Sequence, residues 1–132
     1  MKMRTWEISG WYLCAVGVIH SLVGVMMFKD ELLDMVRAGI VNSIKDQMDL
    51  HAAFWFMLTG FLFIYIGWLW QKQIDRDKGP LSKFTASGMT LMTVAGVIIM
   101  PISGFWLLLP LCVIMLHSTY AFKHSERAGS DG

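Results

Sequence analysis

Residues 9–28 read SGWYLCAVGVIHSLVGVMMF and contain no Asp, Glu, Lys or Arg. Three later stretches, residues 50–70, 82–100 and 102–122, are also apolar, and Lys83 is the one charged residue among them. About 20 helical residues, at ~1.5 Å each, cross a hydrocarbon core of ~30 Å. Because the apolar residues do not alternate with a period of two, we predict helices rather than the strands of a membrane barrel. The sequence therefore predicts an all-α, four-helix transmembrane bundle that forms one integral membrane domain.

The composition agrees with a membrane protein. Hydrophobic residues make up 55% of the 132 residues and charged residues 16%, whereas soluble domains carry about a quarter of charged residues. A soluble domain of this size has too much surface to bury so many apolar side chains. The net charge of +1 gives no sign of a polyanion partner, so we expect no binding to nucleic acid. We expect the protein to contact the lipid bilayer instead.

Lys and Arg residues gather on one predicted side of the membrane. The N-terminal segment, the connection between the second and third spans and the C-terminal segment together carry eight of them, whereas the connection between the first two spans carries three. Cytoplasmic connections are enriched in Lys and Arg. We therefore predict that the N- and C-termini both face the cytoplasm.

The first connection carries a helical repeat. Apolar residues recur every four positions from Leu32 through Val36, Ile40 and Ile44 to Met48, which is close to the 3.6-residue period of a helix. The segment at about 30–48 is therefore predicted to form a short external amphipathic helix that lies on the outer membrane surface or caps the bundle.

Small residues recur every seven positions in the first two spans. This spacing keeps them on one face of each helix, and small residues let helix backbones approach closely in lipid. We therefore predict that the first two spans pack as a tight pair. The predicted packing residues are Gly10, Gly17 and Gly24 in the first span, and Ala53, Gly60 and Gly67 in the second.

The interiors of the spans hold no carboxylate, which disfavours the proton-coupled exporters that depend on one. His20 is the most conspicuous ionisable residue there and lies ~12 Å below the outer end of the first span. A neutral, hydrogen-bonded imidazole is the simple interpretation, and a ligand-binding role is the alternative. Polar and aromatic residues on the outer side could form a pocket above it. The candidate ligand-binding residues are His20, Arg37, Asn42, His51, Trp55, Ser103 and Trp106.

Catalytic and metal motifs are missing from the sequence. We find no nucleophile–base pair, and no spacing typical of a metal site, so we predict no enzyme activity, no cofactor and no metal. A haem held by His20 and His117 is disfavoured because the two residues differ in depth by ~10 Å. Cys14 and Cys112 fall in the middle of their spans and are interpreted as small core residues.

Several short stretches carry a family resemblance, and the most distinctive is PISGFWL at residues 101–107. The others are GVIH at 17–20, RAG at 37–39 with Asn42, and FWF at 54–56. Over roughly residues 9–122 the chain resembles an uncharacterised bacterial family of small four-span membrane proteins, known only as a domain of unknown function. The resemblance implies a bacterial inner-membrane location and no activity, ligand or catalytic residue.

The sequence thus predicts a small, non-enzymatic membrane protein. Its outer half would bind a lipid-like or small hydrophobic ligand, or a membrane protein partner, and a homo-oligomer is also possible. Two alternatives stay open: a redox or haem-linked membrane subunit that uses His20, His117 or Cys14, and a small transporter without an embedded carboxylate.

Overall fold

The computed structural model describes residues 5–40, 44 and 47–130, with side chains as far as residue 122. Over these residues the chain is helical with short turns and has no strand, which confirms the predicted all-α class. The elements are η1 (Thr5–Ile8), α1 (Ser9–Met27), α2 (Lys29–Arg37), α3 (Met48–Asp77), α4 (Lys83–Ile99), η2 (Gly104–Leu108) and α5 (Leu109–Ser130).

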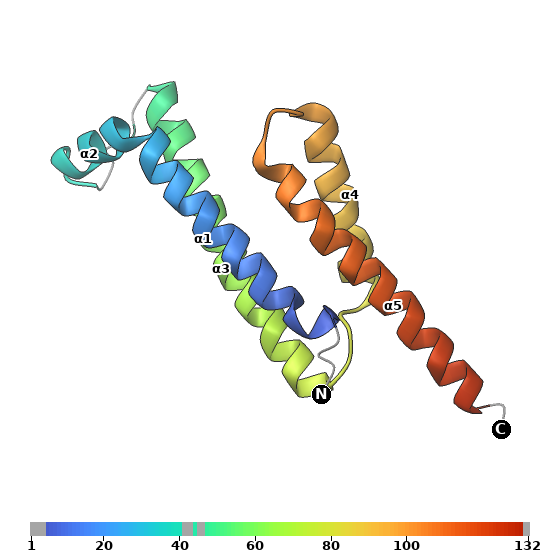
Figure 1. Ribbon diagram of the computed structural model, residues 1–132. Coiled ribbons are helices and arrows are strands. Elements are labelled where there is room, and N and C mark those ends of the chain that lie inside the picture. Colours follow the sequence, from blue (N-terminus) through green and yellow to red (C-terminus); the bar gives the residue numbers. More distant parts are fainter. Residues whose placement is uncertain (1–4, 41–43, 45–46, 131–132) are drawn as a thin grey trace.

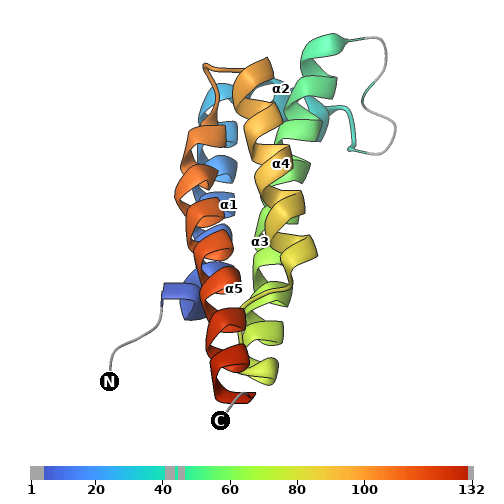
Figure 2. The same cartoon turned by 90° about the vertical axis from the view of Figure 1, so that its right-hand side faces the viewer.

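The long helices form two antiparallel hairpins (Figures 1 and 2). In the first, α1 packs along α3; in the second, α4 packs on α5 and η2. The hairpins come together near η1 and the α3–α4 connection, toward the end of the molecule that carries the two chain termini, here called the terminal end. They are separate toward the opposite end, here called the α2 end, and the last turns of α5 point away from α3. Among the described elements, no Cα atom of α4 lies within 8 Å of one in α1 or α3.

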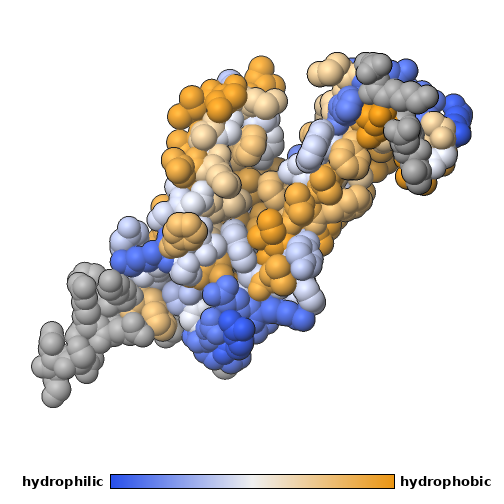
Figure 3. Space-filling model, turned by 180° about the vertical axis from the view of Figure 1, so that it is seen from behind, coloured by the Kyte–Doolittle hydropathy of each residue, from blue (hydrophilic) through white to orange (hydrophobic). Residues whose placement is uncertain are grey.

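Three helices are long and apolar enough to cross a membrane: Thr5–Met27, Met48–Asp77 and Gly104–Phe122. The fourth, α4, is apolar but has 17 residues. Figure 3 shows apolar surface on both hairpins between hydrophilic regions at α2 and at the terminal end. The helices are therefore compatible with a membrane protein, as the composition predicts.

The amphipathic helix is shorter than the predicted segment at 30–48, and this is a correction. Helix α2 ends at Arg37 because Gly39 and Ile40 adopt positive φ angles of 94° and 65°. The amide of Ile40 donates to the carbonyl of Met35, and that of Gly39 to Val36. These two bonds make a Schellman cap with glycine at the position that favours it. The four-residue apolar repeat therefore continues past the end of the helix.

A buried cluster joins the two hairpins near the terminal end. The side chains are apolar and almost fully buried, and they come from every long helix and from the α3–α4 connection: Leu13, Val16, Ile74, Leu81, Ala86, Leu108, Leu111 and Met115. The hydroxyl of Tyr12 adds a hydrogen bond of 2.9 Å to the carbonyl of Leu107. Because Pro110 has no N–H, that carbonyl lacks the donor that a continuing 3-10 turn would supply.

Candidate functional site

The α1–α3 seam is built on glycines that face the partner backbone. A Cβ atom added at Gly17 would lie 2.8 Å from the carbonyl oxygen of Gly60, and one added at Gly67 would lie 2.7 Å from that of Gly10. A Cβ at Gly24 would meet the side chains of Met57 and Phe56 at 2.8 Å. Further along α3, Ala53 is fully buried. All six predicted packing residues are thus at buried positions of these two helices, and five are glycines without room for a methyl group.

Gln71 of α3 stabilises the start of α1, and it was not among the residues predicted from the sequence. Its side chain is buried, accepts a hydrogen bond from the amide of Trp11 at 3.3 Å, and donates to the carbonyl of Glu7 at 2.7 Å. A helix leaves its first amides without intrahelical partners. Gln71 supplies one such partner from α3, at the position where Gly10 lets the helices touch. The signal in the sequence was a glutamine one turn beyond the seven-residue glycine repeat.

His20 lies between aromatic rings of α3. Its ring stacks on Phe56 with centroids 3.9 Å apart and an interplanar angle of 10°, and it meets Phe63 edge-on at 5.9 Å. Its Nε2 atom is 3.1 Å from the carbonyl oxygen of Phe56. Because a carbonyl only accepts, Nε2 carries the proton and donates. His20 is therefore hydrogen-bonded, as its simple interpretation predicts, and half-buried.

His20 lies where the hairpins separate. One stripe of α1 contains Leu13, Val16, His20, Val23 and Met27, since these residues recur at helical spacing. Leu13 and Val16 are 1% and 7% exposed because the second hairpin covers them, whereas Val23 and Met27 are 40% and 63% exposed. The stripe thus passes from the core into an opening at the α2 end, visible as the notch between two lobes in Figure 3.

Two of the predicted ligand residues use their polar atoms within the α4–α5 connection. The Ser103 hydroxyl accepts from the amide of Phe105 and begins η2. The Trp106 indole donates to the carbonyl of Pro101 at 2.8 Å. The ring of Phe105 fits against Gly96, where an added Cβ would lie 2.7 Å from it. These bonds close the tight turn of the PISGFWL stretch.

The other predicted ligand residues lie around α2 and the start of α3. Arg37 is exposed and forms an ion pair with Asp34 at 3.5 Å, His51 is exposed on the first turn of α3, and Trp55 meets Phe54 edge-on. Asn42 lies outside the described residues. Helix α2 points away from the second hairpin (Figure 1), so it does not cover the opening. Within the described residues, Arg37, Trp55, Ser103 and Trp106 share no hydrogen bond or ring contact with His20.

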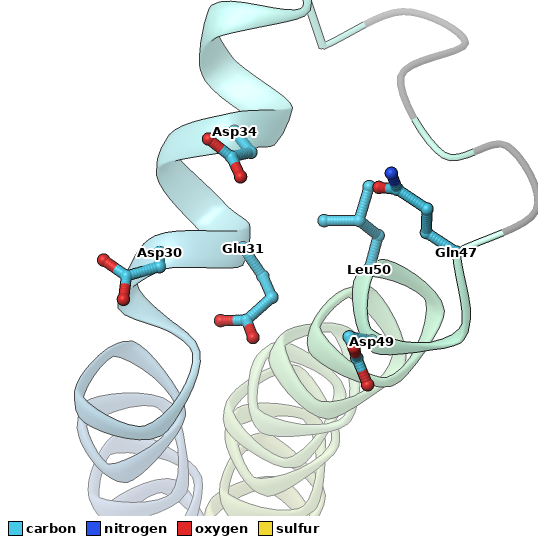
Figure 4. A pocket seen from close by; sticks show the side chains of 6 residues that line it. All are labelled: Asp30, Glu31, Asp34, Gln47, Asp49 and Leu50. Atoms are coloured by element: carbon cyan, nitrogen blue, oxygen red, sulfur yellow. The ribbon is translucent and has the colours of Figure 1, made fainter.

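An acidic pocket of about 350 Å³ lies between α2 and α3 and was not predicted (Figure 4). Glu31 points toward the first turn of α3, near Asp49 and Leu50. The lining residues are Asp30, Glu31, Asp34, Gln47, Asp49 and Leu50. Over the part of the chain that the structure describes, no three His, Cys, Asp or Glu side chains are arranged to hold a metal ion.

The residues of the redox alternative do not converge. His117 lies on the exposed face of α5 with Val113 and Tyr120, away from the stripe that holds His20. Cys14 donates to the carbonyl of Ile64 at 3.3 Å, and the buried Cys112 donates to Thr93 at 3.4 Å. Both thiols are thus hydrogen-bonded within their own hairpins.

Residues 4–121 match the family described as "Family of unknown function (DUF6463)". The chain belongs to this family. No curated protein and no solved structure matches the chain. The DUF6463 match includes both hairpins, the opening beside His20 and the acidic pocket, and its description assigns no activity to any of them.

Proposed function

We propose that this DUF6463 protein is a four-span protein of a bacterial inner membrane, with the terminal end in the cytoplasm. The distribution of charge supports this orientation. Four basic residues that follow the apolar run of α3 lie at the terminal end, Lys72, Arg76, Lys78 and Lys83, whereas the described part of the α2 end carries two, Lys29 and Arg37. Cytoplasmic connections favour Lys and Arg. A phosphatase or fluorescent-reporter fusion at Gly132 tests the proposal, and an external C-terminus would contradict it.

We further propose that the protein is not an enzyme and binds a lipid-like or small hydrophobic molecule in the opening beside His20. The opening carries this proposal: one α1 stripe is buried against the second hairpin as far as Val16 and exposed at Val23 and Met27. Ligand sites are mostly apolar and use a few polar groups to fix orientation. His20 supplies such a group among Phe56 and Phe63.

A membrane protein partner that inserts a helix into the same opening is the second form of this proposal. Both forms need the apolar stripe beyond Val16 to be covered, and both leave the α1–α3 seam unchanged. They differ in the molecule that co-purifies, which makes them distinguishable by experiment.

The test is native mass spectrometry and protein identification on the protein extracted gently from membranes. We expect a retained lipid or partner that is lost in Val23→Trp, because the large side chain occupies the opening, and reduced in His20→Ala. His117→Ala is the matched control, since this histidine lies on the exposed face of α5. Neither retained lipid nor partner in the parent protein would refute the proposal, and so would equal retention in all variants.

A further inference from the structure

A second groove runs along the α1–α3 hairpin on the side away from α4 and α5. It encloses about 410 Å³, within the range of small-ligand sites. On α1, Trp11 and Cys14 project about half a helical turn away from Leu13 and Val16, which face the second hairpin. The lining residues are Trp11, Cys14, Phe61, Ile64, Tyr65 and Trp68.

The groove and Lys72 together span about the depth of one lipid leaflet. Phe61 lines the inner end of the groove, and its lining on α3 ends at Trp68, a rise of ~10 Å along the helix. Lys72 lies one turn beyond Trp68 at the mouth near the terminal end, ~16 Å from Phe61 and about half of a ~30 Å hydrocarbon core. An acyl chain of the adjacent leaflet therefore reaches from the mouth to the inner end.

Lys72 places a positive charge at the mouth of the groove. Its ammonium lies 3.8 Å from the centre of the Trp68 ring. Of the two acids that follow on α3, Asp77 forms an ion pair with Arg76 at 2.9 Å, and Asp75 accepts from the neutral amide of Gln71. In the described structure, no carboxylate forms an ion pair with Lys72.

The side chains that line the groove suit a lipid acyl chain better than a transmembrane helix of another protein. Close approach of two helices in lipid requires small residues at the contact. Here Trp11, Tyr65 and Trp68 line the groove and are 42–57% exposed, with Tyr65 stacked near Trp68 at 6.3 Å. We expect a helix about 10 Å wide to rest on these large rings, and a single acyl chain, which is much narrower, to lie between them.

We propose that this groove binds one acyl chain of an anionic phospholipid from the leaflet at the terminal end, with Lys72 at the headgroup. The site rests on the membrane insertion proposed above but is independent of the opening beside His20. The site combines an apolar slot with a cation, Lys72, at its polar end, and together they extend over about one leaflet. Basic residues next to membrane spans favour anionic lipids.

The experiment uses quenching of tryptophan fluorescence by brominated lipids in vesicles of phosphatidylcholine and phosphatidylglycerol. A variant with Trp6, Trp55, Trp70 and Trp106 changed to Phe keeps only Trp11 and Trp68, which line the groove. We expect brominated phosphatidylglycerol to displace phosphatidylcholine with about fivefold preference, the effect of about one Lys at an anionic surface.

Lys72→Gln should remove this preference. Lys83→Gln is the matched control, because Lys83 also lies over an aromatic ring, that of Tyr120 at 5.1 Å, but on the second hairpin. Equal quenching by both lipids would overturn the proposal, as would an equal loss in both Lys variants. If the variant with four Trp residues changed to Phe does not fold, native mass spectrometry gives a second measurement. It uses the protein with all its tryptophans, with and without the Lys substitutions, in the same lipid mixtures.

A second copy of the chain in the groove is the competing occupant. In that case cross-linking through the single cysteine of a Cys112→Ala variant would give a Cys14–Cys14 dimer, and both brominated lipids would quench weakly. That pair of results would refute the lipid site. Lipid binding at the groove should persist in the Val23→Trp variant, in which the opening beside His20 is blocked. This result would support the groove even if the proposed function fails.

Discussion

Gly17→Ala tests the α1–α3 seam. The added methyl carbon would lie 2.8 Å from the carbonyl oxygen of Gly60 and equally close to the amide nitrogen of Ile64. Both are backbone atoms, which no change of rotamer moves. Ordinary contact begins near 3.4 Å, so the helices must separate by about 0.6 Å, at a cost that overpacking places at about 1–3 kcal/mol.

The net effect on the free energy of unfolding follows from two opposing terms. Alanine favours a helix over glycine by about 1 kcal/mol, which offsets part of the clash and leaves a destabilisation of up to about 2 kcal/mol. Gly88→Ala is the control, because Gly88 is also inside a helix and an added Cβ there meets nothing within 4 Å. It should be neutral or stabilise the protein by up to about 1 kcal/mol.

The assay is reversible unfolding in mixed micelles by titration with a denaturing detergent, followed by tryptophan fluorescence. We expect the Gly17→Ala midpoint to fall and the Gly88→Ala midpoint to stay or rise. If the two variants unfold at the same point, close backbone contact is not what holds α1 and α3 together.

Three further changes test other contacts. Gln71→Leu leaves a first-turn amide of α1 without its partner and should destabilise the protein by about 2–3 kcal/mol in the same titration; an unchanged midpoint would contradict this role. Tyr12→Phe removes the bond to η2 and should widen the distribution of distances between spin labels at Val23 and Ile98, whereas an identical distribution would show that the bond does not hold the hairpins. Gly39→Ala strains the cap of α2 by about 1 kcal/mol and should speed hydrogen exchange in α2 alone; global destabilisation would disagree.

The hydropathy of the sequence predicted the long helices well, because a charge-free run of about 20 residues has few alternatives to a membrane helix. The seven-residue spacing of small residues likewise identified which faces of the first two spans lie at buried positions. Both signals are local and periodic. The sequence also carries a signal for the end of α2, since Gly39 follows Arg37 at the spacing of a Schellman cap, although the four-residue apolar repeat runs on to Met48.

The contacts between the hairpins could not be predicted from local sequence periodicity. The bond from Tyr12 to Leu107 joins residues 95 positions apart, and it depends on a carbonyl left free by a proline and a 3-10 turn. The prediction of an outer pocket required all polar residues at the same membrane depth to face the same cavity. The structure instead assigns Ser103 and Trp106 to their own turn and Arg37 to Asp34, because polar groups in an apolar setting take the nearest partner.

The divergence of the hairpins follows from where small and large residues lie. Glycines at 10, 17 and 24 keep α1 against α3 along its whole length. The second hairpin touches α1 through Leu108 at the end of η2 and Leu111 in the first turn of α5, opposite the terminal half of α1. Beyond His20, which packs on Phe56 and Phe63 of α3, the described helices leave this stripe exposed at Val23 and Met27. In the membrane proposed above, lipid, a ligand or a partner helix would have to fill this apolar opening, because the exposed side chains of the stripe would otherwise have no apolar neighbour.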